Sequence, residues 1–302
     1  MIRLARLPVT LLAALFAIAS SASSQELRPV TGTEPSDGQR VVLVTGSTGG
    51  LGREVARRLA AGGAHVIVHG RSADRGVELV EEIEAEGHGS ARLYLADFGS
   101  FDDVRALADA IGRDYARLDV LVNNAGVWLE GPRQLSDDGH ELHLQVNYLS
   151  SFLLTRELLP LLRQSAPSRI VHVSSIAQRP IDFDNVMLES DYSDGRAYAQ
   201  SKLAQILFNL DLAEELAGTG VTTNALHPAT MMDTDMVLER GARARASVHD
   251  GADAVMYLIE GEELGSGHYF NQTDRARANE WAYDEAARDR LRMLAERLTG
   301  AG

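Results

Sequence analysis

The sequence predicts an α/β protein: a single domain on a doubly wound, mainly parallel sheet of seven strands, with helices on both faces. Short, continuously apolar runs, of which 41–44 and 118–122 are the clearest, indicate strands buried on both sides. They alternate with segments of helical periodicity, as is typical of parallel sheets. The 302 residues, 45% of them hydrophobic, suffice for one large domain with a buried core.

Composition excludes several classes of protein. The formal net charge is −14 and no basic stripe is present, which argues against nucleic acid as a partner. The acidity is that of a solvated surface. Because the chain has no cysteine, a disulfide scaffold, a thiolate metal site and a cysteine nucleophile are excluded.

Residues 1–24 have the pattern of a secretory signal peptide: two arginines, an apolar run over 7–19 and then small residues. The run is short for a membrane span, which needs about 20 residues. We therefore expect export, to the periplasm or outside the cell. The alternatives are an uncleaved anchor, which confines membrane contact to this segment, and a misassigned start codon, which leaves the protein cytoplasmic. Residues 25–39, rich in proline and glycine, predict a flexible linker.

The first half of the domain begins with a strand, a glycine-rich turn and a helix. The turn, residues 45–52, reads Thr-Gly-Ser-Thr-Gly-Gly-Leu-Gly. Such a turn presents backbone N–H groups and the positive end of a helix dipole to an anion such as a pyrophosphate. We expect strands at 41–44, 64–69, 91–96 and 118–122, and helices at 53–61, 72–86 and 101–115.

The end of the second strand indicates which dinucleotide would bind. An acidic residue there would bind the 2′-hydroxyl of NAD. This chain has Arg71 instead, which can pair with the 2′-phosphate of NADP, and Arg53 adds charge just beyond the glycines. We therefore predict NADP as the cofactor, in preference to NAD. Asp97 and Phe98 close the third strand, where the aspartate is expected to accept from the adenine amino group.

The second half continues the alternation. We expect strands at 169–173, 221–226 and 268–270. We expect helices over 135–162, which carries Asn147, from 197, at 251–260 and over 274–298, the last of them charged and amphipathic. A polar segment over 177–196 and a lid at about 229–245 complete this half. A metal site is not predicted. His140, Glu141 and His143 lack the His-Glu-x-x-His spacing, and no third ligand is evident.

A tyrosine and a lysine in the helix from residue 197 indicate proton-transfer chemistry. Tyr198 and Lys202 are four residues apart, so both project from one helix face. A phenol with a pKa of about 10 is a poor acid or base at neutral pH, and a nearby ammonium lowers that pKa. Ser174 and Ser175 follow the strand at 169–173, at the edge where a parallel sheet places ligand-facing groups.

Taken together, these motifs resemble the short-chain dehydrogenase/reductase family over about residues 40–275. The resemblance implies one NAD(P)-binding Rossmann-fold domain over 40–302, with the lid and a C-terminal helix. The cofactor motif is matched by Thr45, Gly46, Gly50 and Gly52, with Ser47 and Leu51 between them, the Asn-Asn-Ala-Gly motif by Asn123, Asn124, Ala125 and Gly126, and the catalytic tetrad by Asn147, Ser175, Tyr198 and Lys202. Pro228 adds a cofactor contact, although Ala229 stands where the family usually has glycine.

The resemblance also implies a reaction. The long interval between Ser175 and Tyr198 is similar to the retinol dehydrogenase branch, so we expect NADP-dependent hydride transfer between an alcohol and an aldehyde or ketone, with a small apolar or retinoid-like substrate. Tyr198 would exchange the proton, Lys202 would lower its pKa and hold the nicotinamide ribose, Ser175 would polarise the carbonyl, and Asn147 would place a relay water. Family members commonly dimerise through the helices that bear Asn147 and Tyr198.

Two other functions stay open at this point. A nucleotide-sugar epimerase or dehydratase shares the Tyr-x-x-x-Lys pair, but usually has a different glycine spacing and a larger C-terminal substrate domain. A non-catalytic NADP-binding sensor is the second alternative, and the intact tetrad argues against it.

Overall fold

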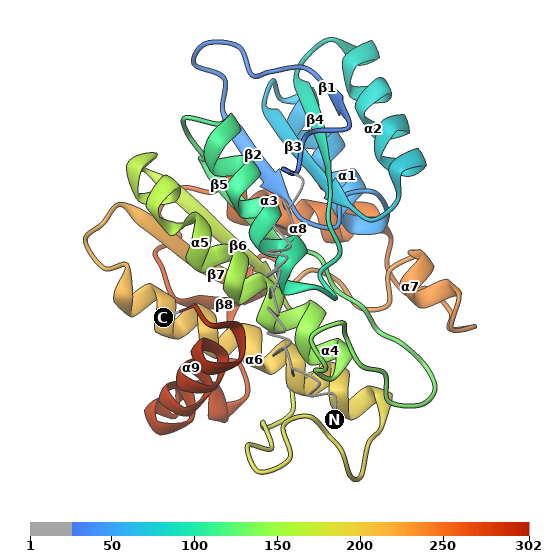
Figure 1. The fold of residues 1–302 in the computed structure, drawn as a ribbon, viewed down its shortest axis with the longest axis vertical. Coiled ribbons are helices and arrows are strands. Elements are labelled where there is room, and N and C mark those ends of the chain that lie inside the picture. The colour runs from blue at the N-terminus through green and yellow to red at the C-terminus, as the bar shows by residue number, and fades with distance from the viewer. Residues whose placement is uncertain (1–25, 302) are drawn as a thin grey trace, which may run out of the picture.

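The structure, a computed structural model, describes residues 26–301 (Figure 1). The predicted signal peptide or anchor, residues 1–24, lies outside the described residues. Within the described part of the chain, no helix combines the length and the apolar character that a membrane crossing requires.

Seven parallel strands form the centre of the fold, which confirms the predicted sheet. In spatial order they are β4 (Ser90–Leu95), β3 (His65–Gly70), β2 (Val41–Val44), β5 (Val120–Asn123), β6 (Ser168–Val173), β7 (Val221–His227) and β8 (His268–Asn271). Two short antiparallel strands extend the edges, β1 (Thr31–Gly32) beside β4 and β9 (Asp274–Ala276) beside β8, so the described sheet has nine strands.

Helices cover both faces of the sheet, as the alternation predicted. One apolar cluster joins the even residues of β2 to α1 (Gly50–Ala61), α2 (Ala73–Glu86) and α8 (Val248–Glu260). The other joins the odd residues of β2 to α3 (Phe101–Asp114), α5 (Ser150–Gln164) and α6 (Asp194–Glu215). Successive β2 side chains therefore enter opposite cores, as they must in a strand buried on both sides.

Part of the segment that was expected to be a flexible linker is bound to the sheet. The Val30 N–H donates to the Leu93 carbonyl at 2.8 Å, and the Thr33 N–H donates to the Ala91 carbonyl at 3.0 Å. Gly32 lies between them at φ +107°, where a Cβ would stand 2.1 Å from the Ala91 oxygen. Only glycine therefore allows this close pairing along β4.

Two predicted helices begin later than expected. In the first, Leu135 bridges Glu141 in a turn through Gly139, and helix begins only at α4 (Leu142–Leu144), continuing through the π-helical turn η1 (Gln145–Leu149) into α5. In the second, the chain reverses at Gln272 into β9 and a 3-10 turn, η2 (Glu280–Tyr283). Helix α9 (Glu285–Thr299) then starts where the Asp284 side chain accepts from two backbone N–H groups.

Helix α9 packs against α6, one of the two helices through which a homodimer was expected. Apolar side chains of both helices belong to the same core, and Arg292 pairs with Asp211 at 3.0 Å. The chain's own C-terminus therefore covers part of that helix.

Three buried histidines make the stability of this fold sensitive to acid. Burial lowers the pKa of His65 and of His69 to about 4, and that of His172 to about 3. Each is therefore neutral in the folded protein, whereas in the unfolded chain each binds a proton below about pH 6.5.

We predict that the free energy of unfolding falls as the pH is lowered from about 6.5 to about 4, because the unfolded state binds more protons across this window. Each histidine contributes a slope of about 1.4 kcal/mol per pH unit. His65→Gln should remove one such contribution. Urea unfolding at a series of pH values measures the slope. Identical slopes in His65→Gln and the wild type would contradict the prediction.

Candidate active site

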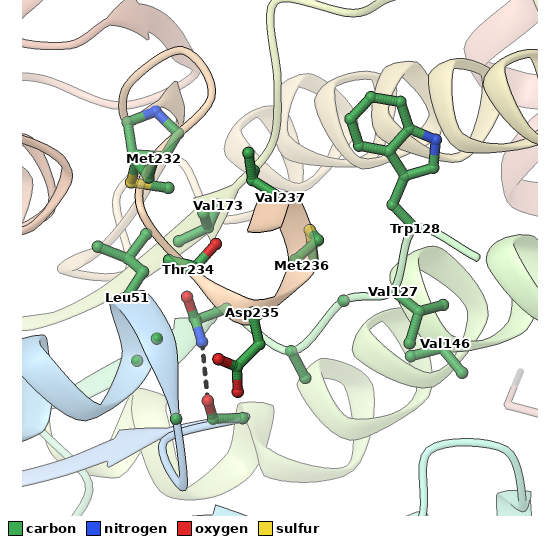
Figure 2. A pocket seen from close by; sticks show the side chains of 18 of the residues that line it. Leu51, Val127, Trp128, Val146, Val173, Met232, Thr234, Asp235, Met236 and Val237 are labelled. Atoms are coloured by element: carbon green, nitrogen blue, oxygen red, sulfur yellow. Dashed lines mark hydrogen bonds between the residues drawn. The ribbon is translucent and has the colours of Figure 1, made fainter. Parts of the chain in front are cut away.

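Most of the predicted site residues line a cleft of about 540 Å³ at the C-terminal ends of the parallel strands. It lies between the glycine-rich turn and the lid, residues 229–245, which contains the short helix α7 (Asp235–Leu238). Figure 2 shows part of its wall: Leu51 on one side, Trp128 and Val146 on the other, and Thr234, Asp235 and Met236 of the lid between them.

Hydrogen bonds between two turns hold the glycine-rich end of the cleft. The Thr45 hydroxyl oxygen accepts from the backbone N–H groups of Asn124 and Ala125, both at 3.0 Å. In return, the Asn124 amide donates to the Thr45 carbonyl at 2.8 Å. Because β2 and β5 are neighbours in the sheet, their two following turns can be joined directly.

The glycines allow the turn to pack more closely against neighbouring backbone than residues with a Cβ could. A Cβ on Gly46, which has φ +66°, would stand 2.9 Å from the Ala125 Cα. A Cβ on Gly52 would stand 2.4 Å from the Gly46 oxygen and 2.5 Å from the Asn124 amide nitrogen. With Gly50 also at positive φ, the turn forms a side-chain-free cradle at the N-terminus of α1, which fits the pyrophosphate of a dinucleotide.

Two residues of the cofactor motifs are buried behind the cleft. Ser47 donates to the Val44 carbonyl and accepts from the His69 N–H, which joins β2 to β3. The Asn123 amide donates to the Thr155 hydroxyl at 2.9 Å. Both side chains therefore bond to neighbouring parts of the fold and do not line the cleft.

At the adenosine end, the structure separates the two arginines predicted from sequence. Arg71 lines the cleft, 67% exposed, with Asp97 at 3.5 Å. Arg53 points away from the cleft and pairs with Glu82 of α2 at 2.6 Å, so it adds no charge there. Its position on α1 places it over the acidic face of α2.

Arg75, in the first turn of α2, takes the position that was expected for Arg53. It lines the cleft and pairs with Asp235 of the lid at 3.0 Å. The sequence gives one signal for it, the four-residue step from Arg71 into the next helix. Asp97 accepts from the Gly99 N–H at 2.8 Å with one carboxylate oxygen and faces Arg71 with the other. The ring of Phe98 packs on His69.

Tyr198 and Ser175 both line the other end of the cleft. Burial raises the pKa of Tyr198, and a hydrogen bond with Ser175 lowers it in part. The direction is opposite to the lowering expected from sequence, because burial outweighs every other influence. The neighbouring Ser174 donates to the Lys202 carbonyl at 2.7 Å and so anchors α6 to β6.

Lys202 lies one helical turn after Tyr198 on α6, and its side chain is almost completely buried. Its ammonium donates to the Val173 carbonyl at 2.9 Å and to the Gln205 side-chain oxygen at 3.0 Å. It is 5.7 Å from the centre of the Tyr198 ring. Burial lowers the pKa of Lys202 to about 7.

Asn147 connects the catalytic helix to the loop after β5. Its amide oxygen accepts from the Val127 N–H at 2.7 Å, and its nitrogen donates to the Ser201 hydroxyl at 2.8 Å. A Cβ on Gly126 would be 3.2 Å from the Asn147 oxygen and 3.3 Å from the Lys202 nitrogen. Asn147 occupies the π-helical turn η1, a feature found frequently at functional sites.

The lid contacts the catalytic end through an aromatic stack that the sequence only partly indicated. Trp128 lies on Tyr198, with ring centres 4.9 Å apart and planes at 21°. The Arg240 guanidinium lies over the other face of Trp128 at 3.8 Å, paired with Asp194 at 2.8 Å and Glu130 at 3.3 Å. Arg240 had no recognisable sequence signal.

The histidine pair that was weighed as a metal site has another role. His143 donates to Glu141 at 2.7 Å and accepts the Leu129 N–H at 3.0 Å, which anchors the loop that carries Trp128. Among residues 26–301, no group of three or more histidines and carboxylates is placed to hold a metal ion.

Comparison with known proteins identifies the family. The family model described as short chain dehydrogenase matches residues 40–245. The chain is 36% identical to human retinol dehydrogenase 12 over 275 residues, 86% of each chain, and 37% identical to human retinol dehydrogenase 11 over 267 residues, 83% of each. A solved short chain dehydrogenase from Burkholderia cenocepacia in complex with NADP has a TM-score of 0.63 and 30% identity, covering 78% of this chain and 97% of that one.

The chain therefore belongs to the short-chain dehydrogenase/reductase family, as its motifs predicted. Within that family it is retinol dehydrogenase-like. It is an NAD(P)-dependent oxidoreductase that acts on CH–OH donors, so the predicted class of enzyme is confirmed.

We predict that Gly52→Ala displaces the glycine-rich turn, because its Cβ would collide with the Gly46 carbonyl. The free energy of unfolding should fall by about 1–3 kcal/mol, and the Kd for NADPH should rise about tenfold or more. Gly112→Ala is the matched control: it also lies in a helix, and a Cβ there meets nothing within 4 Å. It should stabilise the protein by up to about 1 kcal/mol. Denaturant unfolding measures the free energy of unfolding, and NADPH fluorescence measures the Kd. Equal changes of these two quantities in the two variants would refute the prediction.

Proposed function

We propose that this chain is an NADP-dependent oxidoreductase that interconverts an alcohol and an aldehyde or ketone, with Tyr198 as general acid and base. The observation that carries the proposal is the meeting of Tyr198, Ser175 and Lys202 in the same cleft as the glycine cradle. A nicotinamide cofactor supplies or accepts the hydride there.

Proton transfer is the task of the chain's own residues. Burial raises the pKa of Tyr198, so the phenol is protonated near neutral pH and can give its proton to a carbonyl oxygen during reduction. Ser175 lines the same cleft as the phenol, and in this proposal its hydroxyl donates to the same oxygen and polarises the carbonyl. The charged form of Lys202 stabilises the phenolate that remains.

Asn147 has a supporting role in this proposal. Its side chain is occupied by Val127 and Ser201, so it positions the loop and the catalytic helix directly. Its oxygen and the Lys202 nitrogen both face Gly126. This arrangement supports the relay of a proton from Lys202 past Gly126 through water.

The preference for NADP rests on the two arginines at the adenosine end. Arg71 and Arg75 both line the cleft and are both more than half exposed, so their guanidinium groups are available to a phosphate. No acidic residue stands at the end of β3 to bind a ribose 2′-hydroxyl.

The substrate end of the cleft is apolar. Trp128, Leu129, Ile176, Met231 and Met236 contribute to its lining, and Ile176 is 58% exposed at its edge. The printed names of the two human relatives refer to retinol. We therefore propose a small apolar or retinoid-like alcohol or carbonyl compound as the substrate.

Tyr198→Phe should lower kcat about a hundredfold or more, because it removes the transferred proton and keeps the ring. NADPH consumption by the full chain, assayed against a panel of aldehydes and ketones that includes retinal, measures the effect. Tyr257→Phe, an exposed tyrosine far along the chain, is the control and should match the wild type. Turnover that persists in Tyr198→Phe would refute the mechanism. NADPH binding without turnover of any compound by the wild type would favour the sensor alternative.

Arg71→Ala and Arg75→Ala should each raise the Kd for NADPH about ten- to a hundredfold, because each removes a charged partner of the 2′-phosphate. The Kd for NADH, which lacks that phosphate, should change little. Arg53→Ala serves as the matched control, since Arg53 is held by α2 away from the cleft. Titration of each variant with NADPH and with NADH measures the two Kd values. Equal losses for NADPH and NADH would contradict the proposal.

A further inference from the structure

One residue next to the catalytic lysine has no role in the mechanism above. Gln205 lies on α6, three residues after Lys202, and is completely buried. Its side-chain oxygen accepts a hydrogen bond from the Lys202 ammonium at 3.0 Å. The flanking residues of α6, Ala204 and Ile206, are buried and apolar.

Packing alone does not explain a glutamine at this position. Among the described residues, the Gln205 amide nitrogen has no hydrogen-bond partner. Burying an amide with an unsatisfied N–H destabilises a fold relative to an apolar side chain of similar size. The one polar contact that Gln205 makes with its side chain is to Lys202, so the reason for this residue type lies there.

The geometry shows what that contact does. The Val173 carbonyl approaches the ammonium from β6 and the Gln205 oxygen approaches it from α6, so two of its three N–H groups are directed by fixed acceptors. The third is left for the cleft, which Lys202 lines. Without Gln205, the Val173 carbonyl would be the sole hydrogen-bond acceptor for this ammonium among residues 26–301.

We infer that Gln205 is a positioning residue for the reaction proposed above: its amide oxygen holds the Lys202 ammonium against the Val173 carbonyl and leaves one N–H facing the cofactor cleft. The inference rests on the proposed function, in which Lys202 stabilises the Tyr198 phenolate.

The neutral character of the amide matters as much as its position. A carboxylate at this distance would form a buried ion pair and favour the charged lysine strongly. The amide orients the ammonium without that bias, and burial keeps the pKa of Lys202 at about 7, close to working pH. Gln205 therefore supplies direction while leaving the charge of the lysine adjustable.

Two variants of the full chain test the inference. Gln205→Met keeps the volume and removes the acceptor, so kcat should fall about ten- to a hundredfold through misplacement of the ammonium. Gln205→Glu keeps an acceptor oxygen and adds a charge, so activity should survive, and the loss of kcat at alkaline pH should move to higher pH by about one unit or more. The sign follows because the ammonium is lost above its pKa, and the carboxylate raises that pKa.

Asn209→Ala is the matched control. Asn209 is a buried amide one turn further along α6, and its hydrogen bonds go to Thr223 and the His268 carbonyl. It should leave the pH profile of kcat unchanged. Circular dichroism checks the fold of each variant.

Wild-type kcat in a folded Gln205→Met, or an unshifted alkaline limb in Gln205→Glu, would overturn the inference. If Gln205→Met fails to fold, the alkaline limb of the pH profile of kcat in Gln205→Glu tests the inference by itself. Tyr198→Phe in the same assay distinguishes failure of this inference from failure of the proposed function. Turnover in Tyr198→Phe would refute the proposed function itself. If Tyr198→Phe is inactive and the Gln205 variants keep the wild-type kcat and pH profile, only the positioning role is refuted.

Discussion

The hydrogen-bonded pair of turns after β2 and β5 is the constraint on which the site depends. Thr45 and Asn124 bind each other's backbone, so the glycine cradle cannot move independently of the Asn-Asn-Ala-Gly loop. That loop continues into Gly126, beside Lys202, and Trp128, on Tyr198. The cradle and the residues proposed to transfer the proton are therefore positioned by the same two adjacent parallel strands.

Burial, rather than nearby charge, sets the acid–base character of the site. It raises the pKa of Tyr198 and lowers that of Lys202 to about 7, which separates a phenol and an ammonium that have nearly equal acidity in water. The surrounding contacts of Lys202 are uncharged oxygens from Val173 and Gln205. A polar but neutral shell lets both groups change protonation without breaking an ion pair.

The sequence predicted what depends on local pattern and missed what depends on tertiary packing. Continuous apolar runs and glycine spacing located all seven parallel strands and the cradle. Helical periodicity placed helix over 135–141, where Gly139 at φ +81° makes a turn instead. Arg53 and Arg75 are both basic residues near the glycines, and only the packing of α1 on α2 shows that the second faces the cleft. Arg240 reaches Trp128 across 112 residues of chain, a separation that no short motif records.

Two lid residues, Asp235 and Arg240, form ion pairs of different exposure. At the adenosine end, the side chains of Arg75 and Asp235 are 59% and 63% exposed, whereas that of Arg240 at the catalytic end is only 14% exposed. Dissolved salt screens exposed charges far more effectively than shielded ones. Rising ionic strength should therefore weaken the Arg75–Asp235 pair before it weakens the ion pairs of Arg240.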